Sequence, residues 1–242
     1  LKEEVETQKE VRDLNKVFEE TSTNEYDDLK NRLEYSYPYA ENIDLKTKFS
    51  VSEIKRMSQS EEFEVKENKK PTINAGNASE RGNAYHKLMQ KIHYENIDKF
   101  RSREDFVREE ISLLNNHVYR ELINPLDIVK FLDSKLGADF IKYNDSLKRE
   151  NQFIMGIPAK EAGMGESDET ILIQGIIDAY IEKDDNIILV DYKTDNVRDA
   201  ESLIKRYKTQ LMLYKKSLEM STGKTVNDIF IYSFALGKEI KI

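Results

Sequence analysis

The chain has 242 residues, and its 38 Lys and Arg side chains against 46 Asp and Glu give a formal net charge of −8 at pH 7. It has no Cys and 3 His, which excludes a disulfide framework, a zinc ribbon, thiolate-bound iron-sulfur clusters and a multi-histidine metal cage. No long apolar run or secretory segment is evident, so we expect no membrane association and a location in the reducing cytoplasm.

Charge is distributed unevenly along the chain. Residues 1–30 carry 5 basic and 10 acidic side chains, whereas residues 191–242 carry 10 basic and 7 acidic ones. An acidic total normally counts against a nucleic-acid partner, because phosphate contacts come from clustered Lys and Arg. The C-terminal segment nevertheless predicts a local basic face.

The first 45 residues are predicted to be a linker or arm rather than part of a core. Residues 1–20 suggest a polar helix or disordered arm with a thin apolar stripe, and residues 26–39 a short helix followed by an irregular segment. The chain opens on Leu, which indicates a piece of something longer.

Helical patterns begin near residue 50. Ser50 or Ser52 is expected to cap a short helix from Glu53 to Met57, with Ser50 and Glu53 in the spacing of a capping box. A polar loop is predicted over residues 61–78.

Three further helices are expected after this loop. The first begins at Ser79, the second carries apolar residues from Phe106 to Leu114, and the third runs from Pro125 to Phe140.

The pattern changes to that of strands after Lys142. The predicted strands lie at residues 149–159, 169–183 and 186–193. Asp199 then caps a long helix that ends near Met220, and residues 229–235 form a last strand. This order of elements predicts an α/β domain around a small mixed sheet.

The second and third predicted strands place two aspartates face to face. With residues 184–185 as the hairpin loop, Asp178 lies opposite Asp191, and Lys193 emerges on the same face as Asp191. The apolar run before Asp191 predicts a strand that is covered on both faces.

Two carboxylates about 5 Å apart repel each other by roughly 1 kcal/mol in water and by about 4 at an effective dielectric constant near 20. Lys193 offers one compensating charge, and a divalent cation offers two. A structural ion pair and a metal site both account for the residues at this stage.

Four motifs occur in a fixed order along the chain. They are ERGNAYHKLMQ with His86, GIID with Asp178, VDYKT with Asp191, Tyr192 and Lys193, and YKTQLMLY with Gln210 and Tyr214. In this order they resemble the motifs of PD-(D/E)XK nucleases of the RecB-like branch. The segments SVSEIKR and IYSFALGKEIKI are similar to the C-terminal nuclease domains of AddA-type helicase-nuclease subunits.

The resemblance implies a fold and a domain boundary. It covers residues 46–242 and implies an α/β, restriction-endonuclease-like core, with a small mixed sheet flanked by helices. Residues 1–45 would then be an arm from an upstream helicase part.

The resemblance also implies roles for the motif residues. Asp178, Asp191 and the backbone carbonyl of Tyr192 would hold a metal ion, and His86 would be a further ligand or contact the bound phosphate. Lys193 would orient or activate the attacking water.

Three other residues complete the expected site. Gln210 and Tyr214 lie four residues apart on one helix face, where they would hold Lys193 or a DNA strand. Glu150 resembles a carboxylate that some relatives carry on the first core strand, and its membership of the site stays open.

The function implied is a Mg²⁺-dependent deoxyribonuclease, an exonuclease domain for which Mn²⁺ or Ca²⁺ would also suit the ligands. Its partners would be DNA, preferentially single-stranded and delivered by a helicase motor in double-strand-break repair and recombination, and an AddB-type subunit. The segment STGKT lacks the first glycine of a Walker A loop, since position 218 is Leu, so no ATP site is expected here.

Two alternatives stay open at this stage. The first is a free-standing RecB-like exonuclease. The second is a nuclease fold kept as an inactive scaffold or DNA-binding module, against which the intact Asp178, Asp191 and Lys193 argue.

Overall fold

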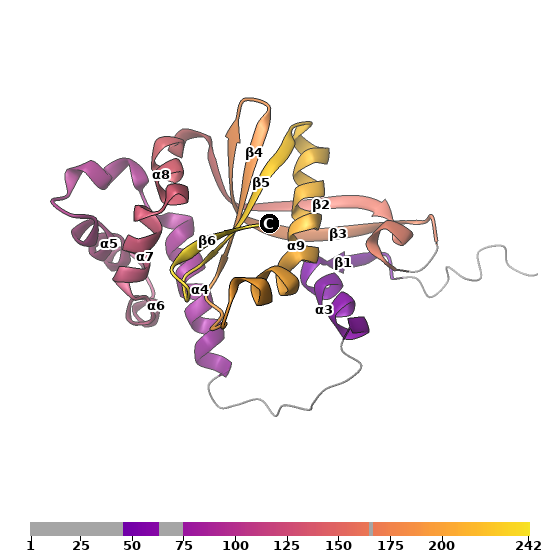
Figure 1. Ribbon diagram of the computed structural model, residues 1–242, viewed down its shortest axis with the longest axis horizontal. Helices are drawn as coiled ribbons and strands as arrows, with labels where there is room; N and C mark the ends of the chain where they lie inside the picture. The colour runs from indigo at the N-terminus through magenta and orange to yellow at the C-terminus, as the bar shows by residue number, and fades with distance from the viewer. Residues whose placement is uncertain (1–45, 63–74, 165–166) are drawn as a thin grey trace, which may run out of the picture. The chain divides into compact units, whose positions relative to one another are not determined.

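The computed structural model describes residues 46–62, 75–164 and 167–242 (Figure 1). The expected arm over residues 1–45, with both of its predicted helices, lies outside the described residues, and so do residues 63–74 of the predicted loop. Residues from Lys46 to Ile242 form one compact unit.

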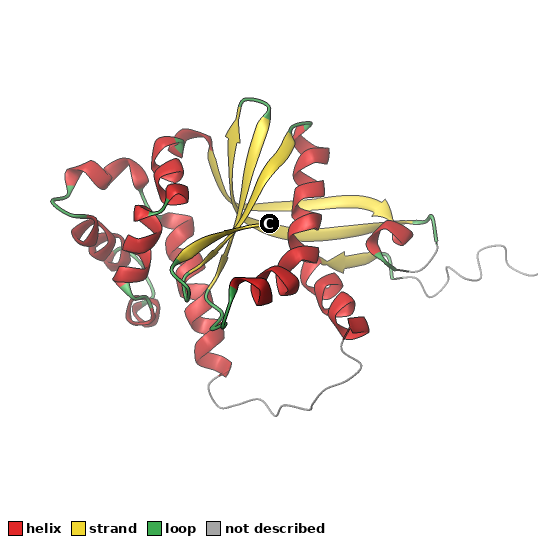
Figure 2. Cartoon of the chain, viewed as in Figure 1, coloured by secondary structure: helices red, strands yellow, loops and turns green. Residues whose placement is uncertain are grey.

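Strands and helices alternate in layers (Figure 2). The strands are β1 (Lys48–Ser50), β2 (Leu147–Pro158), β3 (Thr170–Lys183), β4 (Asn186–Lys193), β5 (Thr225–Ser233) and β6 (Lys238–Lys241). The α-helices are α3 (Val51–Glu62), α4 (Ala75–Lys91), α5 (Arg103–Ser112), α6 (His117–Leu122), α7 (Pro125–Asp133), α8 (Lys135–Lys142) and α9 (Ala200–Thr222). The predicted α/β class with a small mixed sheet is confirmed. Among the residues that the structure describes, no helix has the length and apolar character that crossing a membrane requires.

The long strand β3 organises the sheet. Along one edge it pairs with β2, antiparallel, over residues 170–181. Along its other edge it pairs first with β1, in parallel as far as Gln174, and then with β4, antiparallel from Ala179 onward. Residues 175–178 therefore have no strand partner on this second edge within the described chain, and the sheet splits there.

The other half of the sheet continues from β4. Strand β5 pairs with β4 in parallel, and β6 pairs with β5 antiparallel. Residues 187–192 of β4 are all buried, so the prediction that this strand is covered on both faces is confirmed.

The hairpin between β3 and β4 has the predicted register. Lys183 pairs with Asn186 across the two-residue loop, and the ladder runs to the pair of Ala179 and Val190. The φ of Asp184 is 48°, as such tight turns demand. Asp178 and Asp191 are the next residues along the two strands, at the point where the strands separate.

The main core lies between the sheet and the helices from α4 to α8, which gather on one side in Figure 1. Helices α3 and α9 lie on the opposite side of the sheet. The apolar residues predicted on one face of α4, namely Tyr85, Leu88, Met89 and Ile92, are all fully buried.

The predicted single helix from Pro125 to Phe140 is wrong, because the structure contains two helices, α7 and α8. Ser134 is extended and its hydroxyl accepts from the backbone N–H of Gly137, which caps α8. A Cβ at Gly137 would overlap the backbone of Phe131, so the tight corner depends on glycine.

The other differences concern short elements and element ends. The Ser50–Glu53 capping box forms, but α3 runs from Val51 to Glu62, and α4 begins at Ala75 rather than at Ser79. The last predicted strand begins earlier, at Thr225. Strands β1 and β6 and helix α6 were not predicted, because elements of three to six residues show too little periodicity. The cap of α9 at Asp199 is confirmed.

Candidate active site

The candidate active site lies at the split in the sheet, where β4 separates from β3. A cavity of about 560 Å³ opens there. Helix α4 lies close to the end of β4, because a Cβ at Gly82 would come within 3.4 Å of the Thr194 hydroxyl. This approach brings His86 over the two strands.

His86 bridges two oxygen atoms from different strands. Its Nε2 lies 3.1 Å from the carbonyl oxygen of Tyr192, and its Nδ1 lies 3.3 Å from Oδ1 of Asp178. The other carboxylate oxygen of Asp178 accepts a hydrogen bond of 2.8 Å from the backbone N–H of Tyr192. Asp178 is therefore fixed by β4 even though the β3–β4 ladder ends before it.

Lys193 and Asp191 form a buried ion pair on the same strand. Nζ of Lys193 lies 2.5 Å from Oδ2 of Asp191 and donates at 3.1 Å to the carbonyl of Tyr192. The Asp191 side chain is fully buried and that of Lys193 is 11% exposed. The same-face prediction for these two residues is consistent with this geometry.

Gln210 holds the second oxygen of Asp191. Its side-chain amide donates to Oδ1 of Asp191 at 2.9 Å and to the Tyr214 hydroxyl at 3.1 Å. The partner of Gln210 is thus Asp191, where the sequence had suggested Lys193 or a DNA strand.

Glu150 joins the site from β2. The ladder between β2 and β3 pairs Arg149 with Ala179 and Asn151 with Ile177, so Glu150 stands opposite Asp178 with a φ of 51°. This left-handed conformation is uncommon for a residue with a side chain. It places the carboxyl group in the same cavity as Asp178 and His86.

The described residues contain a group that could hold a metal ion. One ligand atom each from His86, Glu150 and Asp178 lie within 4.8 Å of one another. The carbonyl of Tyr192 adjoins this group through His86. Asp191 is not part of it and instead contacts Lys193 and Gln210.

The pKa values at the site depend on burial and on neighbouring charges. Burial lowers the pKa of His86, but the hydrogen bond and the charge of Asp178 outweigh this effect and raise it above its usual value. Burial likewise raises the pKa of Asp178, but His86 and Lys193 bring it below the ordinary value. The contact between His86 and Asp178 is therefore that of a charged pair near neutral pH.

The carboxyl groups of Asp191 and Glu150 show the opposite trend. Burial raises the pKa of Asp191 to about 6, although the charge of Lys193 opposes this effect. Burial and the charge of Asp178 raise the pKa of Glu150. The pKa of Lys193 is raised, because the charges of Asp191 and Asp178 outweigh the effect of burial.

The residues present fit a divalent cation. An imidazole, carboxylate oxygens and a backbone carbonyl are ligands that Mg²⁺ and Mn²⁺ accept. Oδ2 of Asp191 is buried and lacks an aligned hydrogen-bond donor among the described residues, so its charge is balanced only by the Lys193 ammonium. Such a concentration of buried acceptors favours added positive charge.

The structure thus brings all the sequence-predicted site residues to one place and adds neighbours that the sequence reasoning missed. Tyr207 lies with its ring centroid 4.5 Å from Nζ of Lys193, and its hydroxyl donates to Asp195 at 2.9 Å. The helical spacing of three residues between Tyr207 and Gln210 was the available signal.

Comparison with known proteins gives the class to which this fold and site belong. The family model of the PD-(D/E)XK nuclease superfamily matches residues 46–238. The chain belongs to this superfamily, and the resemblance found in its motifs is confirmed.

The similar curated proteins are more specific, and both of those described here are AddA-type subunits of an ATP-dependent helicase/nuclease. The chain is 34% identical over 241 residues to the one from Clostridium botulinum (strain 657 / Type Ba4), covering 91% of this chain and 18% of that protein. It is 33% identical over 259 residues to the one from Clostridium novyi (strain NT), covering 97% of this chain and 20% of that protein. The chain thus spans about a fifth of the length of these relatives.

Proposed function

We propose that this nuclease domain is a divalent-metal-dependent deoxyribonuclease that hydrolyses phosphodiester bonds of single DNA strands. The observation that carries the proposal is the group of His86, Glu150 and Asp178, which shares its cavity with Lys193. A metal site beside a fixed ammonium suits this reaction, because both offset the charge that develops on the phosphate.

In this proposal Asp178, His86 and the carbonyl of Tyr192 hold the metal ion, with Glu150 and Asp191 as further carboxylates. The bound ion would polarise the scissile phosphate and lower the pKa of a coordinated water. Mg²⁺ is the expected ion, and Mn²⁺ or Ca²⁺ would suit the same ligands. His86 must lose its second proton to become a ligand, since metals bind the neutral imidazole.

Lys193 is proposed to orient the attacking water rather than to remove its proton. An ammonium group has three N–H donors, and Asp191 and the carbonyl of Tyr192 occupy two of them. The third is available to a water molecule or to a phosphate oxygen. Because its pKa is raised, Lys193 stays protonated at neutral pH and stabilises developing negative charge.

Gln210 and Tyr214 are proposed as positioning residues. Gln210 fixes Asp191 from α9, and Tyr214 in turn contacts the Gln210 amide. With Gln210 holding one oxygen, Asp191 presents the other to Lys193 in a fixed direction.

The proposal extends to the larger protein. Because the relatives are named helicase/nuclease subunits, we propose that this domain is the nuclease part of an AddA-type subunit that works with an AddB-type partner in double-strand-break repair and recombination. A motor would deliver a single strand to the site. The resulting high local concentration would replace the long-range attraction that a net charge of −8 does not provide.

The test compares end-labelled single-stranded DNA, blunt duplex and closed circular DNA, each with Mg²⁺ and with EDTA. We expect Mg²⁺-dependent cutting of the single strand, weak cutting of the duplex, and loss of cutting as salt rises. Efficient cutting of blunt duplex at moderate salt would favour a free-standing exonuclease. No cutting of any substrate would favour the inactive scaffold.

A further inference from the structure

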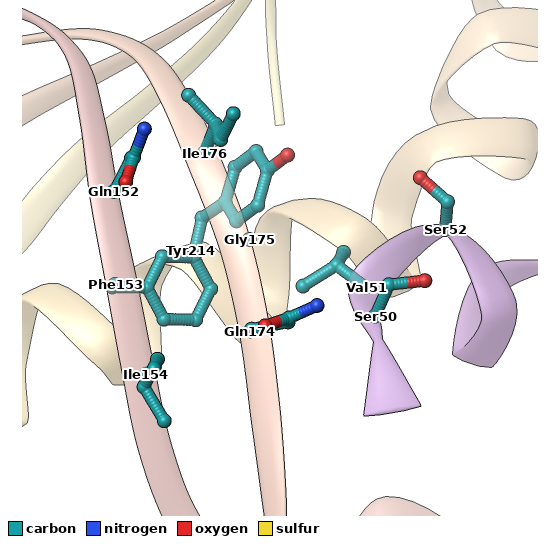
Figure 3. Close-up of a pocket in the computed structure, with 10 residues that line it drawn as sticks. All are labelled: Ser50, Val51, Ser52, Gln152, Phe153, Ile154, Gln174, Gly175, Ile176 and Tyr214. Atoms are coloured by element: carbon teal, nitrogen blue, oxygen red, sulfur yellow. The ribbon is translucent and has the colours of Figure 1, made fainter. Parts of the chain in front are cut away.

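A groove adjoins the candidate active site along the unpaired edge of β3 (Figure 3). Its volume is about 650 Å³. Ser52 and Ile176 line both this groove and the cavity that holds His86 and Asp178, so the two spaces are continuous.

The groove has the chemistry of an uncharged, flat and partly polar ligand. None of the ten described residues that line it carries a charge. The rings of Phe153 and Tyr214 lie edge to face with centroids 5.8 Å apart, and Gln152 and Gln174 supply amide groups. Ile154 is 65% exposed, an apolar surface that costs free energy when it is left in water.

Glycine and one hydrogen-bond chain tie this groove to the site. A Cβ at Gly175 would lie 2.8 Å from the Phe153 ring and 3.0 Å from Val51, so a side chain there would fill the space between them. Tyr214, which lines the groove, contacts the same Gln210 amide that holds Asp191.

We propose that this groove binds unpaired bases of the substrate strand next to the scissile phosphate, an inference that rests on the proposed function. The phosphate lies among the cations of the site, and the neighbouring base lies against the apolar and amide side chains of the groove. Bases stack on aromatic side chains whatever their sequence. A base within a duplex has both faces covered by its neighbours, so the groove selects single strands.

The test measures binding in EDTA, where no metal is present and no cutting occurs. Labelled oligothymidylate is compared with an abasic strand of equal length, which has the same phosphates and no bases. We expect the chain to bind oligothymidylate about tenfold more tightly, the size of one stacked base.

The matched variant replaces Ile154 and Gln174 by Ala. These two exposed residues are a cross-strand pair that lines the groove and not the cavity of the site. The variant should lose most of the preference for bases, whereas a control with Leu113 and Leu126 replaced by Ala should keep it, since both are exposed outside the groove.

Equal binding of both strands by the parent chain, or an unchanged preference in the groove variant, would overturn this inference and assign the groove to a protein surface such as a partner subunit. If the parent chain still cuts single strands with Mg²⁺, only the groove is misassigned. If it neither binds nor cuts DNA, the proposed function fails as well.

A different observation concerns a second lysine near the site. The ammonium groups of Lys55 and Lys193 lie 4.3 and 4.5 Å from the same Tyr207 ring centroid. Lys55 is half-buried on α3, and no carboxylate of the described residues lies within ion-pair distance of it. Burial and repulsion from Lys193 lower the pKa of Lys55, which is the expected state of a cation that lacks an anion.

We infer that Lys55 contacts a backbone phosphate of the bound strand, with Tyr207 as the platform that holds both lysines. A phosphate supplies the anion that the protein does not. Ser52, one turn earlier on α3, lines the junction of the groove and the site, so the same helix face leads from the groove to Lys55.

The readout is the dependence of affinity for oligothymidylate on salt in EDTA. Removal of one phosphate contact should weaken binding and reduce the slope of log affinity against log salt by about 0.7. Lys55→Met should show this change and Lys55→Arg should not. Lys142→Met is the control, because Lys142 also lies over a tyrosine ring, that of Tyr143 on the far side of the sheet.

An unchanged slope in Lys55→Met, with parent-like binding, would contradict the phosphate contact. An equal reduction in Lys142→Met would show that the effect is a general one of net charge. Both results leave the cutting assay untouched and so are separate from failure of the proposed function.

Discussion

The two sides of strand β4 differ in what burial achieves. Toward the helices, Phe131 packs against Phe140 and Tyr232 with ring centroids 5.3 and 4.8 Å away, and all three are fully buried. A few residues along the same strand, Asp191 is just as buried but charged. Apolar burial stabilises a fold, whereas a buried ion pair contributes little or costs free energy. The split in the sheet is therefore built for binding and chemistry rather than for stability.

The largest expected effect concerns Lys193. Lys193→Ala should reduce cutting of single-stranded DNA at least about a thousandfold, because it removes the donor directed at the reacting atoms. The rate of cutting with Mg²⁺ measures this. Lys183→Ala removes a comparable lysine, 3.4 Å from Asp139 on the same hairpin, and should cut at the parent rate. Parent-like cutting by Lys193→Ala would show that the mechanism is wrong.

The apolar side should respond in stability. Phe131→Ala should lower the free energy of unfolding by about 3–5 kcal/mol, since it leaves a cavity in a fully buried aromatic cluster. Urea denaturation measures the change. Leu126→Ala, at a position 52% exposed on the same helix, should change stability by less than about 0.5 kcal/mol. Similar losses in both would mean that Phe131 is not part of a packed core.

The charged side should respond to pH in opposite ways with and without metal. The raised pKa of His86 means that its pairing with Asp178 stabilises the metal-free fold fully below about pH 6.5, and that this contribution is lost as the pH rises through the folded-state pKa. Metal binding needs the neutral ring, so stabilisation by Mn²⁺ should grow over the same interval.

Melting temperatures in EDTA and in millimolar Mn²⁺ between pH 5.5 and pH 8.5 test this dependence. His86→Gln cannot titrate and should show a flatter Mn²⁺ effect over the range. A Mn²⁺ shift that does not depend on pH in the parent chain would remove His86 from the set of metal ligands.

The smallest effect is expected from removing residues 1–45. These residues lie outside the family match, which begins at residue 46, and residues 1–30 hold a net charge of −5. We propose that they tether the domain rather than complete its core. The shortened chain should melt within a few degrees of the parent and cut at a similar rate. Failure of the shortened chain to fold would assign this segment to the domain.

Much of the fold was predictable because its long elements have clear periods. The register of the β3–β4 hairpin followed from its two-residue loop, and that register brings Asp178 beside β4. The break between α7 and α8 was not predictable from periodicity, because it depends on the Ser134 cap and on space that only Gly137 leaves. Strand β1 has three residues, and its pairing with β3 depends on tertiary contacts.

The site was predictable to the extent that its residues stand in ordered motifs. Motif spacing gave His86, Asp178 and Lys193, which the structure places around one cavity. It did not give the conformation of Glu150, whose entry into the site depends on an irregularity in pairing with β3. The groups on Lys55 and Tyr207 come from two helices, and no local pattern in the sequence relates them.

The account depends most directly on metal binding at the split in the sheet, which calorimetric titration with Mn²⁺ measures without any DNA. The parent chain and Lys193→Ala should bind Mn²⁺, because both keep His86, Glu150 and Asp178, whereas Asp178→Ala should lose binding while remaining folded. Absence of binding by the parent chain, or equal binding by Asp178→Ala, would contradict the account.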